Sequence, residues 1–174
     1  MIEEPDWKKG SIHSAVPVEV RALIGSIVIF QGSIEFELRG CISDLLKIDK
    51  DTVLILTSEQ SYKQLMSLLS SLMIKELGTQ NQLYKEFAFA AGKLDEFEAF
   101  RNKVAHSHWS HSLEDMSLQE RAARHKSTSK RKQGLKVSVE EIGADQLTLE
   151  WRKAFFYLGE LFSRVRKVAA GHSS

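Results

Sequence analysis

The chain has 174 residues, a formal net charge of +1, and 43% apolar and 27% charged residues. This length is enough for one domain with a sizeable core, and the composition is typical of a globular protein. The balanced charge gives no overall attraction to nucleic acid or to a membrane, so only local clusters of charge can indicate such a partner. The single cysteine, Cys41, excludes an intrachain disulfide framework and a cysteine-based zinc site.

The beginning of the chain predicts a flexible tail and no export signal. Residues 1–14 are polar and have no hydrophobic periodicity, so we expect one helical domain over residues 15–174. The tail lacks the apolar segment of a signal peptide. The most apolar stretch, residues 18–46, is interrupted by charges such as Glu19 and Arg21 and is therefore not a membrane span. We expect a cytoplasmic protein without a membrane partner, and one cysteine suits a reducing compartment.

The first predicted helix covers residues 18–46. No proline follows Pro17, which favours long helices, and apolar residues recur at alternating spacings of four and three. Gln31 is the one polar member of this stripe. It fits either a buried hydrogen-bonding residue or a residue that sets the register of an interface. Residues 49–57 are predicted to be a connection.

Two further helices are expected before residue 108. Thr57 and Gln60 offer a capping box for the second helix, and Gly78 suits the position just after its end. The third helix is predicted from about residue 79 or 80 to about 107. Gly92 in its interior indicates a close helix crossing. The apolar face of the second helix consists of Tyr62, Leu65, Leu69, Leu72 and Met73.

A basic arm is predicted between the third helix and the last one. Residues 110–119 look like a loop. Leu135, Val137 and Val139 alternate with polar residues, which predicts a strand that pairs with residues 122–128 in a β-hairpin turning around residues 129–134, within an arm of about residues 120–142. The candidate RNA-binding residues are Lys126, Lys130, Arg131, Lys132 and Lys136. Such a cluster suits contacts with phosphate, although a solvated charged loop is an equal alternative. The cluster contains no aromatic residue, so base stacking is not expected from it.

The last predicted helix runs from about residue 144 or 145 to 169, with the same spacing of four and three. The predicted fold is therefore all-α. It is a bundle of four to five helices with a short β-hairpin arm inserted before the last helix.

An arginine stands on the apolar stripe of the third helix. The stripe consists of Leu83, Phe87, Ala90, Leu94, Phe97 and Val104, and Arg101 occupies the position between the last two. An unpaired buried guanidinium is costly, but Glu98 lies one turn back and can pair with it. His106 lies on the adjoining flank with Asn102. A regular helix separates Arg101 and His106 by roughly 140°, so the two can meet only through a sideways reach or a second copy of the helix.

The sequence Arg101-Asn102-Lys103-Val104-Ala105-His106 resembles the signature of HEPN domains. That signature has an arginine, a polar residue after it, and a histidine five positions beyond the arginine. The setting, late on a long helix of a small helical chain and followed by Trp109, is also similar. The resemblance implies a metal-independent endoribonuclease that acts on RNA as a homodimer with a composite site. It further implies a toxin or phage-defence role, no cofactor, and an antitoxin protein as a further partner.

The resemblance also assigns roles to the residues of the motif. His106 would be the general acid or base on the 2′-hydroxyl or the leaving oxygen, Arg101 would hold the phosphate, and Asn102 would orient the pair, with Glu98 and Trp109 in support. The chemistry of these residue types permits this independently. An imidazole takes or gives a proton near neutral pH, and a guanidinium matches two phosphate oxygens. RNA supplies its own nucleophile.

Each of these residues also has a structural interpretation. Arg101 can simply pair with Glu98, and His106 can be a helix-end histidine that the helix dipole favours. Asn102 can be a solvated residue, and Trp109 can fill the core or an interface. Two other functions therefore remain as hypotheses: a non-catalytic module of the same fold that binds RNA, a nucleotide or a protein, and a purely structural bundle. A zinc site is disfavoured by the spacing of the candidates His106, His108 and His111.

Overall fold

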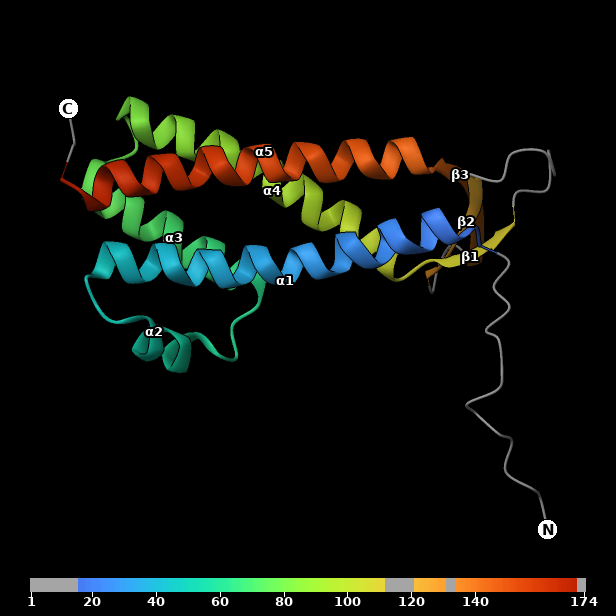
Figure 1. The fold of residues 1–174 in the computed structure, drawn as a ribbon, viewed down its shortest axis with the longest axis horizontal. Coiled ribbons are helices and arrows are strands. Elements are labelled where there is room, and N and C mark those ends of the chain that lie inside the picture. The colour runs from blue at the N-terminus through green and yellow to red at the C-terminus, as the bar shows by residue number, and fades with distance from the viewer. Residues whose placement is uncertain (1–15, 112–120, 131–133, 172–174) are drawn as a thin grey trace, which may run out of the picture.

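The computed structural model describes residues 16–111, 121–130 and 134–171. Within these residues the elements are α1 (Val18–Leu46), α2 (Lys50–Thr57), α3 (Tyr62–Leu77), α4 (Gln82–Ala105), β1 (His108–His111), β2 (Arg121–Lys130), β3 (Gly134–Gly143) and α5 (Ala144–Ala169). Four long helices form the bundle, and the strands gather where α1 begins and α4 ends (Figure 1). This confirms the predicted all-α bundle with a small β arm before the last helix. The predicted tail, residues 1–14, lies outside the described residues.

The bundle is held by the apolar stripes that the sequence predicts. α5 packs against both α4 and α1, and α1 also packs against α3. The core side chains are almost completely buried, as the largest of them show: Ile27, Leu38, Leu65, Leu69, Met73, Phe87, Leu94, Leu147 and Tyr62. Burial of this kind supplies most of the driving force for folding, at about 25 cal/mol per Å² of apolar surface.

One predicted connection is a helix. Residues 50–57 form α2, whose N-terminus is capped by Asp49: its carboxylate accepts a hydrogen bond of 2.8 Å from the backbone N–H of Thr52. The prediction was wrong because α2 has only eight residues, too few to show a helical period. Thr57 is the last residue of α2 and does not cap α3 as predicted. Its hydroxyl donates to the carbonyl of Val53 at 2.7 Å.

The capping box of α3 is therefore displaced from its predicted position. It is formed by Ser61 and Gln64, and the Gln64 side-chain oxygen accepts from the backbone N–H of Ser61 at 2.9 Å and from its hydroxyl at 3.0 Å. Gly78 follows α3 with φ of 76°, a conformation that glycine adopts without strain, as predicted. Gly92 of α4 is exposed, and a β-carbon placed there would meet nothing within 4 Å. Nothing in the described chain crosses α4 at Gly92, so the predicted close crossing is absent from it.

The arm is a three-stranded antiparallel sheet in the order β1-β2-β3. The predicted hairpin is confirmed as β2 and β3, with Lys130 opposite Gly134. β1 adds a strand that begins before the predicted loop and takes residues 110 and 111 from it, with Trp109 opposite Arg124. Ala122 and Ile142 are buried and belong to the core cluster of the bundle. The base of the arm is therefore fastened to the helices.

Candidate functional site

The candidate site lies at the C-terminal end of α4, where the helix meets the arm. The last turns of α4 are anchored by Phe97 and Val104, which are 3% and 0% exposed. The helix ends at His106, whose backbone N–H donates to the carbonyl of Asn102 at 3.1 Å. The backbone of the motif is therefore regular helix up to its histidine, which fixes the directions of its side chains.

Glu98 organises the polar side of this end of α4. One of its carboxylate oxygens lies 3.5 Å from a terminal nitrogen of Arg101, and the other accepts a hydrogen bond of 2.6 Å from the amide nitrogen of Asn102. Glu98 is only 9% exposed, and the Arg101 side chain is 20% exposed. The charge of the arginine on the apolar stripe is therefore compensated inside its own helix, although its Nε atom is buried without a hydrogen-bond partner.

Tyr62, at the start of α3, belongs to this polar region, although the sequence indicated only an apolar-face residue. It is 2% exposed. Burial, and then the negative charges of Asp95 and Glu98, raise the pKa of Tyr62 well above its ordinary value. The hydroxyl therefore stays protonated near Asp95 and near Glu98, the carboxylate that pairs with Arg101. The spacing of apolar residues alone could not have distinguished a tyrosine in this role from one in the core.

Gln31 of α1 lies at the same level of the bundle. Its neighbour Phe30 contacts Phe97 with ring centroids 5.8 Å apart, and Phe97 precedes Glu98. Gln31 is 3% exposed, yet neither its amide oxygen nor its amide nitrogen has a hydrogen-bond partner in the described residues. Of the two alternatives for Gln31, the buried hydrogen-bonding residue therefore has no partner there, and the residue that sets the register of an interface stays a prediction.

His106 does not join Arg101 within one chain. His106 is exposed, whereas Arg101 is turned to Glu98. A separation of roughly 140° around α4 accounts for this. A cavity of about 230 Å³ adjoins the motif on another side of α4, where Phe100, Lys103 and Val104 meet residues of the arm and of α5. The structure thus brings Arg101 and Asn102 together on Glu98 and leaves the histidine open to solvent.

The arm holds the end of α4 in place. The indole N–H of Trp109 donates to the carbonyl of Val104 at 3.0 Å. The guanidinium of Arg124, whose side chain is 8% exposed, forms an ion pair with Glu140 and donates to the hydroxyl of Ser107 at 3.3 Å. Arg124 therefore links the arm to Ser107, the residue after the motif, a contact that the sequence did not predict.

Three of the predicted RNA-binding residues lie on the strands of the hairpin. In the register of the hairpin Lys126 is opposite Ser138, and Lys136 is opposite Thr128. Lys130 ends β2. The other two predicted residues, Arg131 and Lys132, lie outside the described residues.

No metal centre or membrane span is found in the parts of the chain that the structure describes. No group of three or more histidine, cysteine, aspartate or glutamate side chains there could hold a metal ion. The third candidate of the disfavoured zinc site, His111, has no described side chain. Among the described helices, none combines the length and the apolar character needed to cross a bilayer.

Comparison of the chain with protein-family models, with curated proteins and with solved structures found no match in any of the three.

Proposed function

We propose that the chain is a metal-independent endoribonuclease of the HEPN type that works as a homodimer in a toxin or phage-defence system. The observation that carries this proposal is the end of α4, where Glu98 holds Arg101 and Asn102 while His106 stands exposed a little further along. A guanidinium for phosphate and an imidazole for proton transfer are the two groups that this reaction requires.

The reaction proceeds by internal attack within the RNA. The imidazole of one His106 takes the proton of the 2′-hydroxyl, and the 2′-oxygen bonds to the adjacent phosphorus. The bond from phosphorus to the 5′-oxygen breaks, and that oxygen takes a proton from water. The products are a 2′,3′-cyclic phosphate and a 5′-hydroxyl end. Arg101 stabilises the charge on the phosphoryl oxygens during the transfer.

Two features of the site support this assignment. The 3.5 Å separation between Arg101 and Glu98 is longer than a close ion pair, and the arginine is one-fifth exposed, so phosphate can compete with the carboxylate for it. The separation of Arg101 and His106 around α4 is the second feature. A two-fold pairing of chains supplies each arginine with a histidine from the other chain.

The first experiment measures cleavage of a fluorescent single-stranded RNA by the purified protein in the presence of EDTA. Loss of a positioned acid or base costs about 10²- to 10⁴-fold in rate. We therefore expect His106→Ala and Arg101→Ala each to reduce the rate at least 100-fold while the circular dichroism spectrum is unchanged. The matched control is His108→Ala, an exposed histidine two residues further on, which should keep the wild-type rate. Cleavage that survives both motif substitutions would contradict the proposal.

A second experiment tests whether the site is shared between two chains. Equal amounts of the His106→Ala and Arg101→Ala proteins are mixed, unfolded and refolded together. Half of the dimers then contain one chain of each kind, and each of these keeps one intact arginine–histidine pair, so about a quarter of the wild-type rate should return. A mixture that forms dimers but stays inactive would show that the pair is not shared in this way.

One observation favours a second function, a non-catalytic helical module that binds RNA, a nucleotide or a protein. In the single chain Arg101 is engaged by Glu98 and lies away from His106. A module of this kind would bind RNA with the same affinity before and after His106→Ala, and the wild-type protein would release no cyclic-phosphate product.

A further inference from the structure

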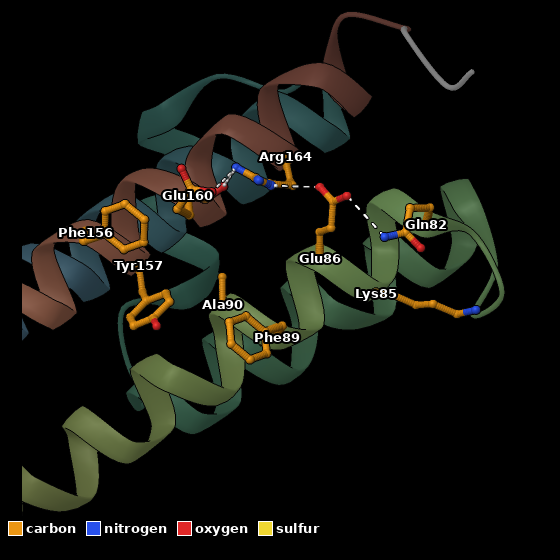
Figure 2. A pocket seen from close by; sticks show the side chains of 9 residues that line it. All are labelled: Gln82, Lys85, Glu86, Phe89, Ala90, Phe156, Tyr157, Glu160 and Arg164. Atoms are coloured by element: carbon orange, nitrogen blue, oxygen red, sulfur yellow. Dashed lines mark hydrogen bonds and ion pairs between the residues drawn. The ribbon is translucent and has the colours of Figure 1, made fainter.

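A second cavity lies away from His106, in the groove between α4 and α5. Its volume is about 400 Å³, within the range of sites for small organic groups. The two antiparallel helices contribute unlike halves to it. Figure 2 shows the aromatic side chains of Phe89, Phe156 and Tyr157 together at one end, and the charged side chains of Glu86 and Arg164 toward the other.

The aromatic half presents uncovered rings. Phe89 and Phe156 are 61% and 60% exposed, although each is large and apolar. Tyr157 contacts both edge-on, with ring centroids 6.0 Å from Phe89 and 5.2 Å from Phe156 and interplanar angles of 74° and 75°. These contacts fix the rings but leave their apolar surface in water. A flat partner that stacks there would remove that surface from water.

The polar half contains paired charges that sum to about zero. Arg164 lies 2.6 Å from a carboxylate oxygen of Glu160 and 3.4 Å from one of Glu86, and the amide nitrogen of Gln82 donates to Glu86 at 3.3 Å. Lys85 also lines the cavity, with its side chain directed away from Glu86, and its charge brings the formal sum of the four charged side chains to zero (Figure 2). The groove therefore has little net attraction for a phosphate. It offers hydrogen-bond donors and acceptors beside a stacking surface, which matches the polar edge and flat faces of a nucleobase.

An open surface of α4 connects this groove to the candidate site. Exposed residues recur at alternating spacings of three and four along this face: Phe89, Gly92, Glu96, Ala99, Lys103 and His106. The distance from Phe89 to His106 along the helix axis is about 25 Å. Lys93 lies 5.9 Å from the centre of the Phe89 ring and 2.7 Å from a carboxylate oxygen of Glu96, so the cation beside the stacking surface is already paired and an RNA phosphate must compete with Glu96 for it.

We propose that the α4–α5 groove binds an unpaired base of a single-stranded RNA whose chain continues along the open face of α4 to His106. This inference rests on the proposed ribonuclease function and adds a second binding site for the same substrate. Aromatic side chains that stack on bases, with cations beside them, are the usual means of holding single strands without reading their sequence. The groove also supplies the base stacking that the basic arm, which has no aromatic residue, does not provide.

The test measures the affinity of the His106→Ala protein for a labelled ten-nucleotide single-stranded RNA by fluorescence anisotropy, so that cleavage does not interfere. Removal of a stacking ring weakens such binding roughly tenfold, and we expect this from Phe89→Ala and from Phe156→Ala. The matched control is Phe155→Ala. Phe155 is on the same helix and 63% exposed, but it contacts Phe30 and Trp151 instead of lining the groove. The control should bind RNA as the parent does.

The outcomes separate this inference from the proposed function. If Phe89→Ala and Phe156→Ala bind the RNA as tightly as the Phe155→Ala control, the groove is not a base site, whatever the cleavage assay shows. If both weaken binding while the wild-type protein cleaves nothing, the groove binds RNA and the ribonuclease proposal fails alone. Equal affinity for AMP or GMP would overturn the assignment to an RNA strand, and loss of a dimer in sedimentation without loss of RNA affinity would assign the groove to a second copy of the chain.

Discussion

At the scale of single residues, the position of Arg101 is explained by its partners. A guanidinium on a packing face is tolerated because Glu98 and the incomplete burial of the side chain compensate its charge. The same carboxylate also fixes Asn102. A change of Glu98 would therefore affect both neighbours at once, which is why the cleavage test replaces Arg101 and His106 and leaves Glu98 intact.

Because of Cys41, the free energy of unfolding should decrease as the pH rises into the alkaline range. It is buried on α1, and burial, followed by the charges of Asp44 and Glu37, raises the pKa of its thiol from 9.0 to about 12. The folded pKa is the higher one, so the folded protein binds more protons between these values. The stabilising contribution of the protonated Cys41 thiol is complete below pH 9. It is lost as the pH rises toward 12, by about 1.4 kcal/mol per pH unit at most.

We therefore expect the free energy of unfolding to fall between pH 8 and pH 10, as measured by urea denaturation. Cys41→Ala should lose about 1 kcal/mol less over this interval than the wild-type protein. The raised pKa of Tyr62 acts in the same direction above pH 10 and remains in both proteins. An identical pH dependence of the two proteins would show that the thiol does not stay buried.

At the scale of elements, the helix that carries the motif depends on its cap. The side-chain oxygen of Asn81 accepts a hydrogen bond of 2.8 Å from the backbone N–H of Leu83 at the start of α4. Such a cap satisfies an N–H that has no partner inside the helix. α4 lies against α5, α1 and α3. Gln82 and Lys85 of its first turn line the α4–α5 groove, so a weaker first turn also affects that groove.

Replacement of the cap should lower stability without touching the motif. We expect Asn81→Ala to reduce the free energy of unfolding by about 1 kcal/mol and Asn81→Asp to preserve it, because aspartate caps equally well and suits the helix dipole. Thermal and urea unfolding measure the difference. Equal losses in the two variants would mean that the side-chain bond to Leu83 does not stabilise α4.

At the scale of the whole molecule, the arm is an extension of the core and not a free appendage. Its base buries Ala122 and Ile142 among the residues of the bundle, and Trp109 and Arg124 tie it to the end of α4. The chain therefore orients a basic hairpin relative to the motif. This matters for the proposed function, because a substrate that touches both must fit their relative placement.

Two positions on β3 test this anchoring. Ile142 is 1% exposed and Val139 is 58% exposed. Ile142→Ala should cost about 2–4 kcal/mol of unfolding free energy, as expected for a truncated core residue, whereas Val139→Ala should change it by less than about 0.5 kcal/mol. Chemical denaturation monitored by tryptophan fluorescence compares the two. Similar small effects in both variants would show that the arm does not share the core.

The sequence by itself determined the class of the fold, the courses of α1, α3, α4 and α5, and the hairpin of β2 and β3. These follow from local rules, since an apolar stripe with a period near 3.6 and an alternating strand can be recognised within one segment. The pairing of Arg101 with Glu98 was also foreseeable, because residues three apart on a helix are neighbours. α2 was not foreseeable, because eight residues whose Leu54, Ile55 and Leu56 remain exposed show no periodic face.

Only the tertiary structure decided which residues from different segments meet. It placed Tyr62 beside Asp95 and Glu98, tied Arg124 to Ser107, and brought Phe89 and Tyr157 together in one groove. None of these pairs is close in sequence, so no local period or spacing of residues indicates that they meet. They depend on which faces the helices bury against one another, and that is set by the packing of the whole core.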